Sequence, residues 1–200
     1  LRHARFRQGR EVDQRMTDVF YDLEFLEDGR TIELISIGMV SDDGREYYAV
    51  NSDMPVDRIL NHQWLKANVW PHLPLRGYKP SPQINALQES DGVLDMTDTR
   101  VKPKWVIANE VRDFLQATPE LKLWANYGAY DHVALAQLWG PMVRLPEGVP
   151  MFTCDIQQER ARLGIAWDQL PQQEGGEHNA LADARHNQTV RRWLAEQEAR

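Results

Sequence analysis

The segment from Ile32 to Val40 constrains the fold most strongly, because it contains an almost unbroken apolar run, Leu34-Ile35-Ser36-Ile37-Gly38-Met39-Val40. A short run of this kind is typical of a strand that is buried on both faces at the centre of a sheet. The turn residues Ser41-Asp42-Asp43-Gly44 follow it and predict a hairpin to a strand over Glu46–Val50. Val19–Glu24 precedes it as another strand. We therefore expect the fold to begin with an antiparallel three-stranded meander.

Helices and strands alternate in the rest of the chain. We expect helices over roughly 55–75, 103–118, 156–163 and 179–198, a helix that begins at Asp131, and strands over Leu121–Ala125 and Met151–Cys154. An antiparallel start followed by this alternation predicts an α/β fold. Its mixed sheet would continue with parallel strands and carry helices on both faces.

Two hundred residues suit one domain. We expect residues 16–200 to form it, with an insertion or long loop at about 76–101, where Pro, Gly, Ser and Asp are frequent. Residues 1–15 hold five Arg against one Glu and one Asp and contain no apolar segment, so they do not resemble a secretory signal. We interpret them as an N-terminal extension that catalysis does not need, with a basic nucleic-acid-binding arm as the alternative.

The composition narrows the classes of function. No apolar run approaches the length of about 18 residues that a membrane span needs. The single cysteine, Cys154, excludes an internal disulfide and a cysteine-rich zinc site, which fits a cytoplasmic protein. The net charge of −7 argues against a polyanionic substrate, unless several of the acids are grouped around bound cations that reverse the local field.

Asp22 and Glu24 are separated by one residue on the first predicted strand, so their side chains point to the same face. Two carboxylates on a central strand are costly to desolvate unless a cation lies between them. Mg²⁺ or Mn²⁺ is the natural occupant, because hard cations prefer carboxylate oxygens. A solvated pair on an exposed edge strand is the other interpretation of these two residues.

His178 and Asp183 flank the predicted start of the last helix. Asn179 suits the N-cap position, which leaves His178 in the preceding loop and Asp183 just over one turn inside the helix. His178 alone is more typical of a surface loop, and Asp183 of a solvated helix face. Asp131 is likewise explained by the preference for acids in the first turn of a helix.

Taken together, these residues match a known pattern. Asp22 and Glu24, then Asp131, then His178 and Asp183 follow one another along the chain in the order of the three motifs of the DEDD superfamily of 3′–5′ exonucleases. The chain resembles the branch of that superfamily in which His lies five residues before the last Asp. A closer resemblance, carried by the runs 20–38, 128–135 and 137–142, is to the mycobacterial 3′–5′ exoribonuclease family, which is related to ribonuclease T and described as polyadenylate-specific. The likeness covers roughly residue 16 to the C-terminus. It departs in the length of 76–101, in the extended N-terminus, and in the spacing of Asn126, which precedes Asp131 by five residues rather than four.

The resemblance implies a ribonuclease-H-like fold, a homodimer and a two-metal mechanism. In that mechanism Asp22, Glu24, Asp131 and Asp183 hold two Mg²⁺ or Mn²⁺ ions about 4 Å apart, which clamp the attacking and leaving oxygens. His178 accepts a proton from the attacking water, a role that suits imidazole near neutral pH. The resemblance also implies that the substrate is the 3′ end of single-stranded RNA, with a preference for poly(A), and that the product is a 5′-mononucleotide.

Contacts to the substrate are less well defined by the sequence. The resemblance places Phe25 and Leu23 beside the terminal base, although Leu23 suits the core equally well. Arg185, Arg191 and Arg192 could contact phosphate or lie on a solvated helix face. Three alternatives to the RNA exonuclease remain: a DNA 3′–5′ exonuclease of the same superfamily, a non-catalytic nucleic-acid-binding relative, and an aspartate phosphatase, for which the expected Asp-x-Asp is absent from the first motif.

Overall fold

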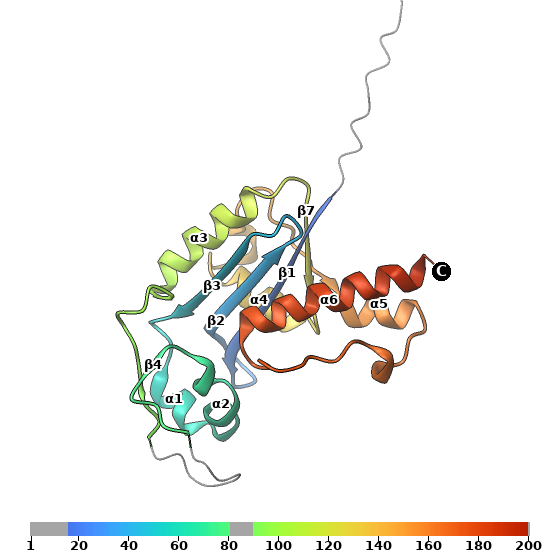
Figure 1. The fold of residues 1–200 in the computed structure, drawn as a ribbon. Coiled ribbons are helices and arrows are strands. Elements are labelled where there is room, and N and C mark those ends of the chain that lie inside the picture. The colour runs from blue at the N-terminus through green and yellow to red at the C-terminus, as the bar shows by residue number, and fades with distance from the viewer. Residues whose placement is uncertain (1–15, 81–89, 200) are drawn as a thin grey trace, which may run out of the picture.

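The computed structural model describes residues 16–80 and 90–199, so the expectation for residues 1–15 lies outside it. The six-stranded sheet has the order β6-β3-β2-β1-β7-β8 (Figure 1). Its strands are β1 (Thr17–Glu27), β2 (Ile32–Ser41), β3 (Glu46–Asn51), β6 (Val101–Lys102), β7 (Leu121–Ala125) and β8 (Cys154–Asp155). The three-stranded meander is confirmed, because β1–β2 and β2–β3 are both antiparallel. The pairs β1–β7, β7–β8 and β3–β6 are parallel, so the sheet is mixed.

The first strand lies in the interior of the sheet, between β2 and β7. This position excludes the interpretation of Asp22 and Glu24 as a pair on an exposed edge strand. β2 is buried along most of its length, as its apolar run predicts. The order of strands therefore places two acidic residues at the centre of the molecule.

Helices cover both faces of the sheet, as expected. They are α3 (Lys104–Gln116), α4 (Ala129–Ala136), α5 (Ile156–Arg162) and α6 (Ala180–Glu198). Val19, Tyr21 and Leu23 of β1 pack in one core with residues of α3 and α4. Phe20 packs in another with residues of α5 and α6, and Figure 1 shows α6 crossing the sheet face. Because side chains alternate along a strand, Asp22 and Glu24 face α6.

The region expected to be one helix over 55–75 is instead three short elements. They are α1 (Val56–Asn61), α2 (Gln63–Asn68) and the 3₁₀ helix η1 (Trp70–His72). His62 separates the two α-helices in an extended conformation and accepts a hydrogen bond from the backbone of Leu65. Their apolar residues form a small core of their own around Trp70, beside Leu26 and Ile35 of the sheet.

The segment 76–101 contains more regular structure than the sequence predicts. Leu75–Arg76 (β4) and Val93–Leu94 (β5) form a separate two-stranded sheet. β6 pairs with β3, which the expectation of a loop missed. The strand expected over Met151–Cys154 begins only at Cys154, where pairing with β7 starts. Two further 3₁₀ helices are η2 (Met142–Arg144) and η3 (Trp167–Gln169). Across the described ranges, no helix has the length and apolar character needed to span a bilayer.

Candidate active site

Asp131 contacts β1 at the point where β1 and β7 no longer pair. The parallel pairing of β1 with β7 covers only Thr17–Phe20, after which the two strands separate. The backbone N–H of Leu23 donates a hydrogen bond of 2.9 Å to Oδ1 of Asp131, in the first turn of α4. This bond satisfies a buried donor beyond the strand pairing and brings Asp131 next to Asp22 and Glu24.

The start of α4 is fixed by Asp155, a residue to which the sequence analysis gave no role. Oδ2 of Asp155 accepts a hydrogen bond of 2.7 Å from the backbone N–H of Gly128, the N-cap residue of α4. Oδ1 accepts from the backbone N–H groups of Gln157 and Gln158 and so caps α5. One carboxylate thus joins the two helices. An aspartate immediately before a predicted helix is a recognisable signal for a cap, but nothing in the sequence points to the bond with Gly128.

The start of α6 brings His178 and Asp183 to the same place. Asn179 caps the helix by accepting from the backbone N–H of Ala182, as predicted. His178 has a φ of +64°, a left-handed conformation that costs energy for a non-glycine residue. Its backbone N–H donates to Oδ2 of Asp183 at 2.9 Å. Gln173 Nε2 donates to Oδ1 of Asp183 at 2.7 Å, so the carboxylate is oriented from both sides.

Gly38 permits this close approach. It lies opposite Asp22 in the β1–β2 pairing, and a Cβ atom there would come within 3.0 Å of the backbone of Ala180 and Leu181. Backbone atoms at the start of α6 cannot move aside as a flexible side chain can. The absence of a side chain at Gly38 is therefore what lets the start of α6, with His178 and Asp183, lie directly over the acids of β1.

These elements assemble a compact group of ligand atoms. One ligand atom from each of Glu24, His178 and Asp183 lies within 4.8 Å of the others, and among the described residues this group alone has the spacing of a metal site. Asp22 and Asp131 are not part of that group of three. The charge of Asp131 acts on Glu24, and the charges of Glu24 and Asp183 act on Asp22, which lines a cavity together with His178 and Asp183.

The acids are electrostatically unfavourable in each other's presence. Burial raises the pKa of Asp22 well above its usual range, and the charges of Asp131, Glu24 and Asp183 raise it further. Burial and the same kind of repulsion raise the pKa of Glu24 to about 8. Burial raises the pKa of Asp131 to about 7, against the opposing hydrogen bond from Leu23, and burial also raises that of Asp183. Among the described residues no lysine or arginine forms an ion pair with these buried carboxylates. Such a group fits a divalent cation, whose charge would reverse these shifts.

Aromatic residues surround the acids. The ring of Trp64, from α2, lies edge-on to that of His178, with 4.8 Å between centroids, although 49% of Trp64 is exposed. The rings of Phe25 and Tyr130 are stacked with 6.3 Å between centroids. Leu23, by contrast, is buried in the core between the sheet and the helices α3 and α4. The sequence analysis missed Trp64 and Tyr130, because nothing in their spacing separates them from core residues.

The arginines of α6 make contacts within the protein. Arg185 pairs with Glu46, and Arg192 with Asp42. The guanidinium of Arg191 lies 4.5 Å from the centroid of Trp124. The ion pairs of Arg185 and Arg192 are on the surface, as the interpretation of a solvated helix face predicts.

Comparison with known proteins agrees with this geometry. The family model described as the 3′–5′ exoribonuclease Rv2179c-like domain matches residues 17–194. The chain belongs to this family. Two curated relatives from Mycobacterium tuberculosis are named 3′–5′ exoribonuclease Rv2179c (strain H37Rv) and 3′–5′ exoribonuclease MT2234.1 (strain CDC 1551). Each is 41% identical over 168 residues, which cover 83% of this chain and 86% of the relative. The resemblance inferred from the motifs is confirmed, and the α/β fold agrees with it.

Proposed function

We propose that this chain is a metal-dependent 3′–5′ exoribonuclease that releases 5′-mononucleotides from the 3′ ends of single-stranded RNA. The observation that carries the proposal is the convergence of Glu24, His178 and Asp183 beside Asp22 and Asp131, in a member of an exoribonuclease family. The residues come from three separate parts of the chain. The buried acids repel one another, and a bound cation would offset this repulsion.

Asp22, Glu24, Asp131 and Asp183 would hold two ions of Mg²⁺ or Mn²⁺. Bound ions of this kind stabilise the charge that develops on the attacking and leaving oxygens of a phosphodiester. The hydrogen bonds from Leu23 to Asp131 and from Gln173 to Asp183 orient two of the four carboxylates. Such outer hydrogen bonds fix the direction of metal ligands and raise the affinity of a site.

His178 would act as the general base. One of its ring nitrogens lies within the ligand group, close enough to Asp183 and Glu24 to take a proton from a water molecule held there. Its backbone is tied to Asp183, and its ring is flanked by Trp64. The left-handed backbone of His178 is a strained conformation of the kind that collects at functional sites.

The terminal base would stack at Phe25, beside Tyr130. Phe25 follows Glu24 directly on β1, and 54% of Tyr130 is exposed, so the pair offers an accessible aromatic surface next to the acids. A preference for poly(A) and a homodimeric state belong to the proposal through the family resemblance. Sedimentation analysis tests the dimer directly.

The test is a comparison of 5′-labelled poly(A), poly(U) and DNA of equal length, each incubated with Mg²⁺ or Mn²⁺ and with EDTA. We expect stepwise shortening of RNA from the 3′ end with metal alone, and faster shortening of poly(A). Asp183→Asn should lose the activity, whereas Asp113→Asn, an exposed residue of α3, should keep it. Preferential shortening of DNA would identify a DNA exonuclease, and intact substrates throughout would identify a non-catalytic relative.

A further inference from the structure

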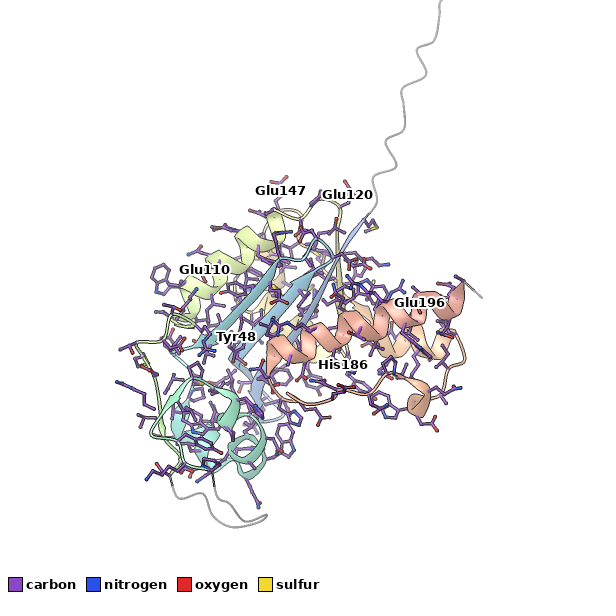
Figure 2. All side chains as sticks on the ribbon, in the orientation of Figure 1. Tyr48, Glu110, Glu120, Glu147, His186 and Glu196 are labelled. Carbon is purple, nitrogen blue, oxygen red and sulfur yellow. The ribbon has the colours of Figure 1, made fainter. Side chains whose placement is uncertain are left out.

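A cavity of about 330 Å³ opens beside the acids, between α6 and the segment from α5 to η3. Asp22, His178 and Asp183 form its boundary with the candidate active site. His186 of α6, labelled in Figure 2, also lines it. The cavity is large enough for a planar heterocycle and is continuous with the place where a phosphodiester would be cleaved.

The chemistry of the cavity suits a nucleobase better than a phosphate. Ile156, Leu170 and Val190 contribute apolar walls that are buried in the core beneath α6. Neither lysine nor arginine is among the described residues that line it, so a phosphate would find no cationic partner there. A nucleobase needs apolar walls and a few polar groups at its edge.

Polar groups and an aromatic ring are available at the rim. Asn126 uses its Oδ1 to accept from Gln157, which leaves its amide nitrogen as a donor. Gln172 uses its Nε2 to donate to the carbonyl of Leu170, which leaves its side-chain oxygen as an acceptor. Trp167 is 52% exposed and lines the cavity. Tyr127 lies beside it, with 6.3 Å between ring centroids.

Neither Phe25 nor Tyr130, the stacked pair proposed for the terminal base, is among the residues that line this cavity. Asp22 lines the cavity, whereas Phe25 follows Glu24 further along the same strand. We propose that the cavity binds a nucleobase of the substrate strand, on the side of the scissile phosphate opposite Phe25. This inference rests on the proposed nuclease function and adds a second base site to it, so that the nucleotides on both sides of the cleaved bond are held.

The first test uses steady-state kinetics on single-stranded RNA with Trp167→Ala, Trp167→Phe and the control Trp105→Ala. Trp105 is also exposed but lies on α3, which packs against β3 and does not line the cavity. Loss of a base-stacking ring should raise KM about tenfold in Trp167→Ala, which corresponds to about 1.4 kcal/mol, with kcat changed less than about twofold. Trp167→Phe should restore most of the affinity. Equal KM values for Trp167→Ala and Trp105→Ala would overturn the proposal.

A second measurement reads the cavity without catalysis. Because a nucleoside could also stack at Phe25, all variants in this measurement carry Phe25→Ala. Saturation-transfer NMR with adenosine and with uridine, in EDTA, should show binding of a nucleoside to Phe25→Ala and to Phe25→Ala/Trp105→Ala, and a loss of that signal in Phe25→Ala/Trp167→Ala. No transfer in Phe25→Ala, or the same transfer in Phe25→Ala/Trp167→Ala, would contradict a nucleobase cavity. A nucleoside contains no phosphodiester and its binding needs no metal, so this measurement tests the cavity alone. Failure of the wild type to shorten RNA would contradict the proposed function and not the cavity.

Discussion

The substitution Gly38→Ala tests whether the close contact between β2 and α6 sets the geometry of the site. The new Cβ would lie within 3.0 Å of backbone atoms of Ala180 and Leu181, whereas ordinary contacts begin near 3.4 Å. The backbone φ of Gly38 lies outside the left-handed region, so alanine meets this contact and no strain of its own. Relief requires the start of α6 to retreat by roughly 1 Å, since α6 is the element that can be displaced from the sheet. His178 and Asp183 move with it.

A shift of about 1 Å in positioned groups lowers a rate by roughly 100-fold. Overpacking costs about 1–3 kcal/mol, and a domain of this size loses roughly 2–4 °C of Tm per kcal/mol. We therefore expect Gly38→Ala to remain folded, with a modestly lower Tm and a loss of kcat of about 100-fold. Ile107→Val, a buried change on the opposite face of the sheet, is the control, because it lowers stability by about 0.5–1.5 kcal/mol without touching α6.

The assay combines thermal denaturation, the rate of shortening of 5′-labelled RNA with Mg²⁺, and calorimetric titration with Mn²⁺. Weaker binding of Mn²⁺ should accompany the lower rate, because Asp183 moves away from Glu24. If Gly38→Ala matched Ile107→Val in rate and in affinity for Mn²⁺, the structural role assigned to Gly38 would be refuted.

Three further predictions follow from the same site. The pKa of Glu24, about 8 in the folded protein, exceeds the ordinary value of 4.5, so the folded state binds a proton that the unfolded state has lost. Without metal, the stability that Glu24 contributes therefore falls as the pH rises from about 4.5 to about 8. The Tm should fall less over this range in Glu24→Gln or with added Mg²⁺, and identical profiles of Tm against pH would contradict this. In Asp155→Ala the free energy of unfolding, measured by urea denaturation, should fall by about 1–2 kcal/mol because α5 loses its cap. The kcat should fall about tenfold because Gly128 at the start of α4 loses its hydrogen bond, and an unchanged kcat would show that Asp155 does not act on the site. Phe25→Ala should raise KM for RNA about tenfold and Phe25→Tyr should not, and equal KM values for the two would remove Phe25 from the substrate contacts.

The parts of the fold that the sequence predicts are those set by neighbouring residues. The meander follows from the apolar run of β2 and the turn at Gly44, and the strand over Leu121–Ala125 has the predicted bounds. The cap at Asn179 follows from local chemistry as well, because its side chain reaches a backbone group only three residues ahead. Motif order and strand parity then indicated which acids come together.

The parts that the sequence does not predict depend on distant contacts. Pairing of Val101–Lys102 with β3 joins residues about fifty positions apart, and no local pattern specifies it. The residue type and helical spacing of Trp64 do not distinguish it from a core residue, and only the packing of α2 places its ring against His178. The role of Gly38 depends likewise on α6, which follows it by more than 140 positions. In a strand, a glycine of this kind indicates close approach without naming the partner.

The central claim is that the acids and His178 form one metal-holding site for hydrolysis from the 3′ end. The most direct test is the pattern of products from 5′-labelled single-stranded RNA with the wild type and Asp22→Ala, with and without Mg²⁺. We predict a ladder of RNAs shortened one nucleotide at a time in the wild type with Mg²⁺, and full-length RNA in EDTA or with Asp22→Ala. Shortening of RNA by Asp22→Ala at the rate of the wild type would contradict the account. So would short 5′-labelled fragments that arise by cleavage at internal positions, without a ladder of single-nucleotide steps.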